Sequence, residues 1–174
     1  MRGACFDQRA ASRFSQPQCG NLSRFLMKRE LSLRERALAL LARREHTRAE
    51  LARKLSPNAE SAEAVEVLLD ELAARGWLSE VRFAESRANT LSRKFGSRKI
   101  EYDLKSRGVS AEVIERTVER ALEQELDNCR AAWLKKFGVQ PQSAAEHGRQ
   151  MRFLAGRGFS AETVRRVLKA KDGD

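Results

Sequence analysis

The sequence predicts an all-α protein made of three tandem three-helix repeats, each helix-turn-helix-like, that join into an elongated, curved body. Three observations lead to this fold class. From Arg34 onward, apolar residues recur at spacings of three and four, the period of an amphipathic helix. Helix-stopping glycines and helix-capping serines divide this pattern into short segments. A six-residue motif occurs twice, fifty residues apart, and such repetition is typical of stacked helical units.

Residues 1–30 stand apart from the rest of the chain. They show neither helical nor strand periodicity, and Pro17 and Gly20 interrupt what pattern exists. Periodicity begins just after Met27. We therefore expect residues 1–30 to be a disordered or wrongly assigned N-terminal tail: either Met27 is the true start, or residues 1–26 are disordered.

The first repeat is predicted over residues 31–79. Its first helix, at about 34–44, precedes a short helix that Thr47 opens. Thr47 can accept from the amide of Glu50 while the Glu50 side chain reaches back, which makes a capping box. A third helix is expected at about 62–75, where apolar residues again follow the helical period.

The second repeat is predicted over residues 80–126. Ser79 starts its first helix, Gly96 ends the turn that follows, and Ser97 caps a shorter second helix. Ser110 then caps the third helix. The order of three helices with a stop and a cap between them therefore recurs.

The third repeat is predicted over residues 127–174. Its helices are expected at about 127–136, at about 144–156 behind a capping box at 143–146, and at about 161–170. The three segments complete a third set of the same kind.

Two short motifs carry the evidence for internal repetition. Residues 107–112 (RGVSAE) match residues 157–162 (RGFSAE), and residues 94–96 (KFG) match residues 136–138 (KFG). The first pair is fifty residues apart and the second forty-two, which indicates a longer loop in the last repeat. The alternative is a compact nine-helix bundle in which these junctions match by coincidence.

The net charge of +10 is unevenly distributed along the chain. Residues 1–30 hold six basic against two acidic side chains, and residues 127–174 hold ten against five. Residues 31–79 are neutral, and residues 80–126 carry a net charge of +1. A basic excess favours polyanionic partners such as DNA, RNA or an acidic protein groove. The alternative is a solvated surface without a partner.

Two clusters of basic side chains are the candidate residues for binding a protein partner or DNA. Arg98 and Lys99 lie at a predicted helix N-terminus, where the helix dipole favours a phosphate or a carboxylate. If the repeats stack, both clusters could line one concave side. The first cluster comprises Arg93, Lys94, Arg98, Lys99, Lys105 and Arg107, and the second comprises Lys135, Lys136, Arg149, Arg152, Arg157, Arg165 and Arg166.

The sequence shows no constellation typical of catalysis, of a metal site or of a cofactor site. Its two histidines and three cysteines form no zinc-ligand pattern, and Cys129 is expected to be a small core residue. The Gly156-Arg157-Gly158 segment lacks the later glycine and the Lys-Ser/Thr pair of a nucleotide-binding loop. We therefore expect no enzyme, no metal and no cofactor.

The sequence also lacks the marks of a membrane or secreted protein. No apolar run reaches the roughly 18 residues that a membrane helix needs, and no apolar segment follows Arg2. We expect a cytoplasmic monomer.

Several motifs occur in a specific order and spacing. They are LLARREHTRAELARKL at 40–55, GWLSEVRFA at 76–84, GSRKI at 96–100 after a basic stretch, and RFLAGRGFS at 152–160. Together they resemble the signatures of the regulatory protein RecX family. The resemblance covers about residues 33 to 170.

This resemblance implies a modulator of the RecA recombinase. Proteins of that family fold as three tandem three-helix repeats, bind in the helical groove of the RecA–DNA filament, and generally inhibit its growth, ATPase activity and strand exchange. The implied partners are the RecA filament and, non-specifically, single- and double-stranded DNA, in DNA repair, homologous recombination and the SOS response. Asn89-Thr90 and Val81 depart from the family pattern on the surface of the second repeat.

Two other classes of function compete with this reading. Helix pairs such as 80–93 with 98–107 resemble a helix-turn-helix DNA-binding regulator. Against that class, the second helix carries Glu101 and Asp103 and has no Asn or Gln for reading bases. The other alternative is a generic helical scaffold with a protein partner unrelated to recombination.

Overall fold

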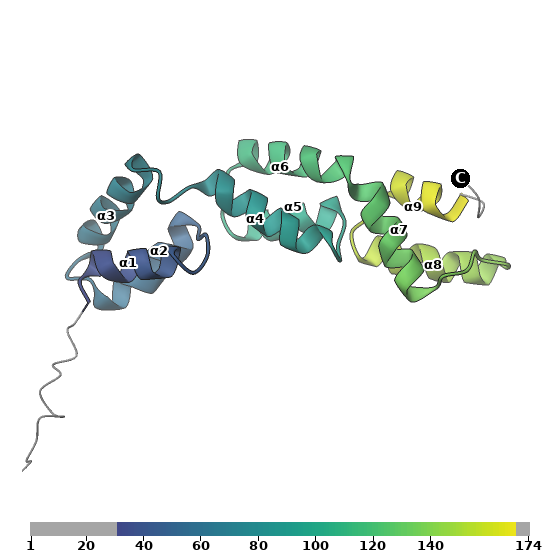
Figure 1. Ribbon diagram of the computed structural model, residues 1–174, viewed down its shortest axis with the longest axis horizontal. Coiled ribbons are helices and arrows are strands. Elements are labelled where there is room, and N and C mark those ends of the chain that lie inside the picture. The colour runs from purple at the N-terminus through teal and green to yellow at the C-terminus, as the bar shows by residue number, and fades with distance from the viewer. Residues whose placement is uncertain (1–30, 170–174) are drawn as a thin grey trace, which may run out of the picture. The chain divides into compact units, whose positions relative to one another are not determined.

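The computed structural model describes residues 31–169, so the expectations for residues 1–30, including a start at Met27, lie outside the described residues. Within residues 31–169 the regular structure consists of nine α-helices and one short 3₁₀ helix, without a strand (Figure 1). The helices follow one another as three three-helix units. The predicted all-α class with three tandem repeats is confirmed.

The helix bounds are as follows. The first unit contains α1 (Leu33–Leu41), α2 (Arg48–Leu55), the 3₁₀ helix η2 (Ser56–Asn58) and α3 (Ala62–Ala74). The second unit contains α4 (Glu80–Ser92), α5 (Ser97–Ser106) and α6 (Ala111–Glu123). The third unit contains α7 (Glu125–Lys136), α8 (Ala144–Gly156) and α9 (Ala161–Lys169).

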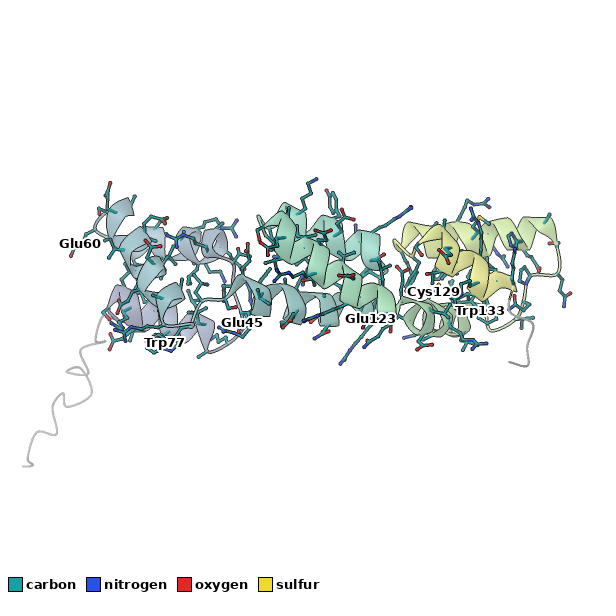
Figure 2. The ribbon with its side chains drawn as sticks, turned by 90° about the horizontal axis from the view of Figure 1, so that it is seen from above. Glu45, Glu60, Trp77, Glu123, Cys129 and Trp133 are labelled. Atoms are coloured by element: carbon teal, nitrogen blue, oxygen red, sulfur yellow. The ribbon has the colours of Figure 1, made fainter. Side chains whose placement is uncertain are left out.

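Each unit buries an apolar cluster of its own. Leu69 is central to the cluster of the first unit, and Leu104 to that of the second, where α6 packs on α4 and α5. In the third unit, Cys129 and Trp133 on α7 (Figure 2) pack with Phe159. Cys129 is fully buried, as predicted, and burial raises the pKa of its thiol to about 12. The three clusters are separate within residues 31–169, which favours tandem units over one compact bundle.

The same glycine turn ends one helix in each unit. Gly76, Gly108 and Gly158 have φ values of 69°, 73° and 84°, a left-handed conformation that glycine adopts without a steric penalty. In each case the N–H of the residue that follows the glycine donates to a carbonyl in the last turn of the helix, as Val109 does to Leu104 at 3.2 Å. The repeated motif in the sequence therefore corresponds to a repeated turn.

The predicted caps at Thr47 and Ser110 do not form as expected. The Thr47 hydroxyl accepts from the N–H of Glu50 at 3.1 Å, but the Glu50 carboxylate pairs with Arg44 instead of completing the capping box. Ser110 precedes α6, yet its hydroxyl donates to the Glu80 carboxylate at 2.9 Å and caps no amide. A nearby charged partner competes with the local cap in both cases.

Candidate functional site

The second and third units meet through the backbones of two glycine turns, and we call this contact the seam. The N–H of Gly96 donates to the carbonyl of Arg157 at 3.0 Å, and the N–H of Arg98 donates to the carbonyl of Gly158 at 3.2 Å. A Cβ on Gly96 would lie 2.4 Å from the carbonyl oxygen of Gly158. Because φ of Gly96 is an ordinary −85°, glycine is needed there for space and not for conformation.

A buried carboxylate, that of Glu125, also holds the seam. Glu125 is 2% exposed and begins α7, two residues before the predicted helix start. It accepts from the N–H and hydroxyl of Ser97 at 2.9 and 2.7 Å, from the hydroxyl of Thr163 at 2.8 Å, and from the N–H of Ser160 at 3.4 Å. Burial raises the pKa of Glu125, but these hydrogen bonds outweigh burial, so its pKa lies below the usual value.

The N-terminus of α5 is filled by the chain itself. The Ser97 N–H donates to Glu125 and the Arg98 N–H to Gly158, while the next two N–H groups donate to the carbonyl of Gly96 at 3.1 and 3.2 Å. Ser97 is the first residue of the helix and not its cap. The predicted dock for an external phosphate or carboxylate at this helix start is therefore wrong, because no amide of the first turn remains to bind it.

The seam brings members of the two predicted basic clusters together. The Arg157 guanidinium donates to the carbonyl of Lys94 at 3.3 Å and lies 4.4 Å from the centroid of the Phe153 ring. Arg98 is bound to the turn that follows Arg157, and both Lys94 and Arg98 expose their side chains. Cations from both units thus share one surface at the seam.

The remaining candidate residues lie elsewhere on the two units. Arg107 is half-buried and ion-paired with Asp103 at 2.9 Å, so it has a structural role within the second unit. Lys135 and Lys136 end α7, and Arg165 and Arg166 lie on α9. The candidates with exposed side chains are Arg93, Lys94, Arg98, Lys99, Lys105, Lys135, Lys136, Arg149, Arg152, Arg165 and Arg166.

The candidate cations differ from those of the first unit in their charge partners. Of the candidates, only Arg107 forms an ion pair within residues 31–169. In the first unit most basic side chains are neutralised, as Arg48 is by Glu66 and Asp70, the latter at 2.7 Å. Exposed basic side chains without an ion pair within residues 31–169 are therefore more numerous on the second and third units than on the first, a distribution that the sequence does not reveal.

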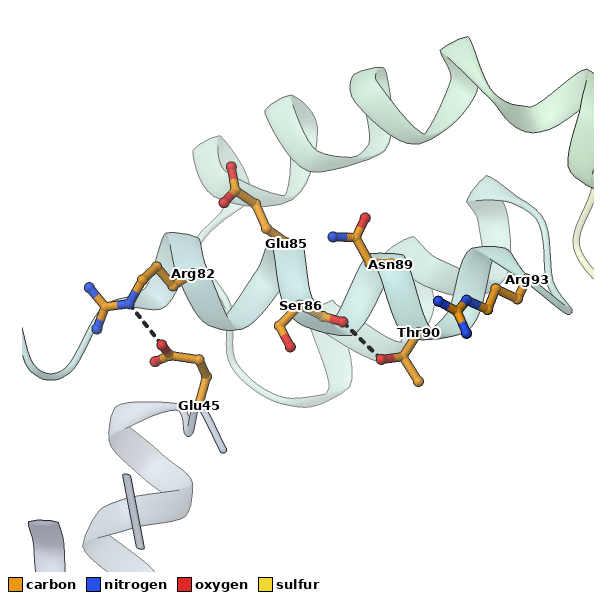
Figure 3. A pocket seen from close by; sticks show the side chains of 7 residues that line it. All are labelled: Glu45, Arg82, Glu85, Ser86, Asn89, Thr90 and Arg93. Carbon is orange, nitrogen blue, oxygen red and sulfur yellow. Dashed lines mark hydrogen bonds and ion pairs between the residues drawn. The ribbon is translucent and has the colours of Figure 1, made fainter. Parts of the chain in front are cut away.

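A polar hollow of about 620 Å³ lies along α4 and is lined by side chains from Arg82 to Arg93 (Figure 3). Across it, the Arg82 guanidinium pairs with the Glu45 carboxylate of the first unit at 2.8 Å. The other carboxylate in its wall, that of Glu85, pairs with Arg120. Because both carboxylates are neutralised, the hollow offers no general acid–base pair.

The buried histidine, His46, has a structural role. Its Nδ1 lies 2.9 Å from the carbonyl oxygen of Arg44, and its Nε2 lies 3.0 Å from the Lys54 ammonium. Burial lowers the pKa of His46, which keeps the ring neutral at neutral pH. Across residues 31–169 no group of three or more His, Cys, Asp or Glu side chains is placed to hold a metal ion. Nor is any helix in that part of the chain long and apolar enough to span a membrane.

Comparison with known families matches all three units. Residues 34–72, 79–118 and 123–168 match the models of the first, second and third three-helix domains of RecX. The chain is 44% identical to the regulatory protein RecX of Leptothrix cholodnii, over 82% of this chain and 91% of the relative. It is 46% identical to the regulatory protein RecX of Chromobacterium violaceum, over 79% and 89%.

Solved structures show the same arrangement of helices. The crystal structure of RecX from Lactobacillus salivarius superimposes with a TM-score of 0.69, covering 79% of this chain and 92% of that one. At 15% sequence identity this likeness concerns the fold alone.

Proposed function

The chain belongs to the RecX family, and from this premise we propose that it binds the RecA–DNA filament and modulates, mainly by inhibition, the recombinase and ATPase activities of RecA. The names of its relatives describe a regulatory protein. We place this action in DNA repair and recombination in the cytoplasm, with the protein acting as a monomer.

The observation that supports the proposal is the set of exposed basic side chains on the second and third units that form no ion pair within residues 31–169. A nucleoprotein filament presents DNA phosphates and acidic protein side chains, both of which attract cations that lack an internal partner. Lys94, Arg98 and Lys99 are exposed, and none of them has an ion pair within residues 31–169. Because backbone hydrogen bonds at the seam fix the start of α5, little ordering is needed when these residues bind.

An ATPase assay of RecA on single-stranded DNA, with substoichiometric amounts of this protein, tests the proposal. We expect strong inhibition by the natural chain. Reversing two charges with Arg98→Glu and Lys99→Glu should raise the protein concentration needed for half inhibition by about tenfold, while circular dichroism shows unchanged helicity.

A matched control reverses two exposed charges of the first unit, with Arg43→Glu and Arg53→Glu, and so produces the same change in net charge. This variant should inhibit within about twofold of the natural chain, because long-range attraction alone is screened at physiological salt. Equal losses in both variants would show that net charge, and not this surface, sets inhibition. No inhibition by the natural chain at any ratio would refute the function itself.

A further inference from the structure

One exposed face of α5 combines an aromatic ring with cations. Tyr102, the single tyrosine of the chain, is 67% exposed. Arg98 and Lys105 lie four residues before it and three residues after it, which places all three on one side of the helix. The Lys99 ammonium lies 5.3 Å from the centroid of the Tyr102 ring. We call these four residues the α5 stripe.

The three cations of the α5 stripe form no ion pair within the described residues. Asp103, next to Tyr102 in the helix, pairs with Arg87 at 2.8 Å and Arg107 at 2.9 Å. Glu101 is exposed, but it forms no ion pair with the stripe within the described residues. Arg98, Lys99 and Lys105 are therefore exposed without an ion pair, while Glu101, Glu115 and Glu119 line a hollow together with Lys105.

The exposed aromatic ring of the first unit provides a contrast. Trp77 has two guanidinium groups over its ring, from Arg34 at 5.7 Å and Arg75 at 5.4 Å. Both are ion-paired with Glu71, at 3.0 and 2.8 Å. The cations over Trp77 are thus already neutralised inside the unit, whereas Lys99, the cation over Tyr102, forms no ion pair within residues 31–169.

We propose that the α5 stripe binds single-stranded DNA, with the Tyr102 ring stacked on one base and Arg98, Lys99 and Lys105 on the flanking phosphates. Aromatic stacking beside a basic track is how proteins hold single strands without reading their sequence. The stripe is about 10 Å long, the length of seven helical residues, which suits a few nucleotides. This inference rests on the proposed function, because the single strand bound by the stripe would be the DNA of the RecA filament.

The chemistry favours a single strand over two other partners. A duplex keeps its base faces stacked inside the helix, so it could use the cations of the stripe but not the ring. An acidic protein surface could pair with the cations but would gain little from stacking. Tyr102 should therefore matter for a single strand and not for its duplex, and this difference is the test.

Fluorescence anisotropy with a fluorescein-labelled oligodeoxynucleotide, alone and annealed to its complement, measures this difference on the full chain. Tyr102→Ala should weaken binding of the single strand about tenfold and change binding of the duplex by less than about twofold. Tyr102→Phe, which keeps the stacking face, should bind the single strand like the natural chain. Unchanged single-strand binding by Tyr102→Ala, or equal weakening of strand and duplex, would overturn the proposal.

Charge removal on the same helix separates the phosphate contacts from general attraction. Arg98→Ala and Lys105→Ala should each weaken binding of both DNA forms and lower the dependence of affinity on salt. Arg116→Ala is the matched control, since Arg116 is exposed but already paired with Glu112 at 2.6 Å. If Arg116→Ala weakens DNA binding as much as Arg98→Ala and Lys105→Ala do, the stripe does not bind the phosphates specifically and the proposal is wrong.

The RecA assay distinguishes failure of this inference from failure of the proposed function. If Tyr102→Ala weakens single-strand binding but the protein leaves the RecA ATPase unchanged, single-strand binding by the stripe is supported and the proposed function is refuted. If the protein inhibits RecA but Tyr102→Ala binds the single strand normally, the function stands and the stripe falls. Competition by polyglutamate that equals competition by single-stranded DNA would instead assign the stripe to an acidic protein surface and overturn the proposal.

Discussion

The seam between the second and third units and the contact between the first and second units use carboxylates in opposite ways. At the seam, the carboxylate of Glu125 is 2% exposed and accepts hydrogen bonds from both units. Between the first and second units, the Glu45 and Arg82 side chains pair at 27% and 47% exposure beside a hollow. Breaking the hydrogen bonds of a buried carboxylate leaves buried polar groups without partners, which costs about 1–3 kcal/mol of stability or more. An exposed ion pair contributes at most about 1 kcal/mol.

The two contacts show that neighbouring units of the chain are joined to different degrees. Backbone hydrogen bonds and the buried carboxylate of Glu125 join the second unit to the third. These two units also hold most of the basic side chains that form no ion pair within residues 31–169. The first unit pairs most of its charges internally and joins its neighbour through a solvated ion pair. The second and third units are therefore joined by buried hydrogen bonds, whereas the first and second units are joined by an exposed ion pair.

The largest effect is expected when the buried carboxylate is removed. Glu125→Ala leaves Ser97 and Thr163 without their acceptor, and it should lower the free energy of unfolding by about 3 kcal/mol. Urea unfolding followed by circular dichroism measures this loss. Glu45→Ala, at the other contact, should cost less than about 1 kcal/mol. Equal costs would end the distinction between the two contacts.

A smaller effect separates the close approach at the seam from the cost of a left-handed turn. Gly158→Ala puts a Cβ 2.8 Å from the Lys99 Cβ at a φ of 84°, while Gly108→Ala meets nothing within 4 Å at a φ of 73°. Both changes cost about 1 kcal/mol for the conformation, and Gly158→Ala should cost about 2 kcal/mol more for the clash. Thermal unfolding of the pair gives this difference directly. If both variants lose the same stability, the seam is looser than its hydrogen bonds indicate.

The smallest effect is expected for the ion pairs of Asp103 inside the second unit. Their contribution to stability is a reference for the contacts between units. The Arg87 guanidinium, with that of Arg107, lowers the pKa of Asp103 to about 2. Because the folded-state pKa lies below the unfolded one, the stabilisation is complete at neutral pH and is lost as the pH falls from about 4 towards 2. Asp103→Asn should therefore cost about 1 kcal/mol at neutral pH, since its partners are partly exposed.

Urea unfolding of Asp103→Asn and the natural chain across this pH range checks the sign. The two free energies should converge in acid, because protonation removes the same charge that the substitution removes. A constant difference at every pH would assign the effect to packing.

The tandem helices follow from local features that a sequence expresses directly. Helical period and the glycine turns at Gly108 and Gly158 depend on residues within about one turn of each other, so both were predictable from spacing. The same holds for Cys129, whose place on the apolar face of its helix predicts burial.

The binding surface was predictable only as a set of basic residues. Composition shows that the third repeat is basic, but it does not show that Arg107 is already paired with Asp103, or that Tyr102 is exposed beside Lys99. Those facts depend on which side chain each helix face meets. A sequence therefore predicts the charge of the surface better than the charge left free for a partner.

By itself, the sequence determined the helices, their grouping into three units and the uneven charge, because each of these depends on neighbours along the chain. Tertiary structure alone decided that Glu125 fills the start of α5 and that Gly96 faces Gly158. Glu125 meets Ser97 across 28 residues and Thr163 across 38. Which donors meet the carboxylate across such separations depends on how the units pack, and packing of this kind produces no periodic or local pattern in the sequence.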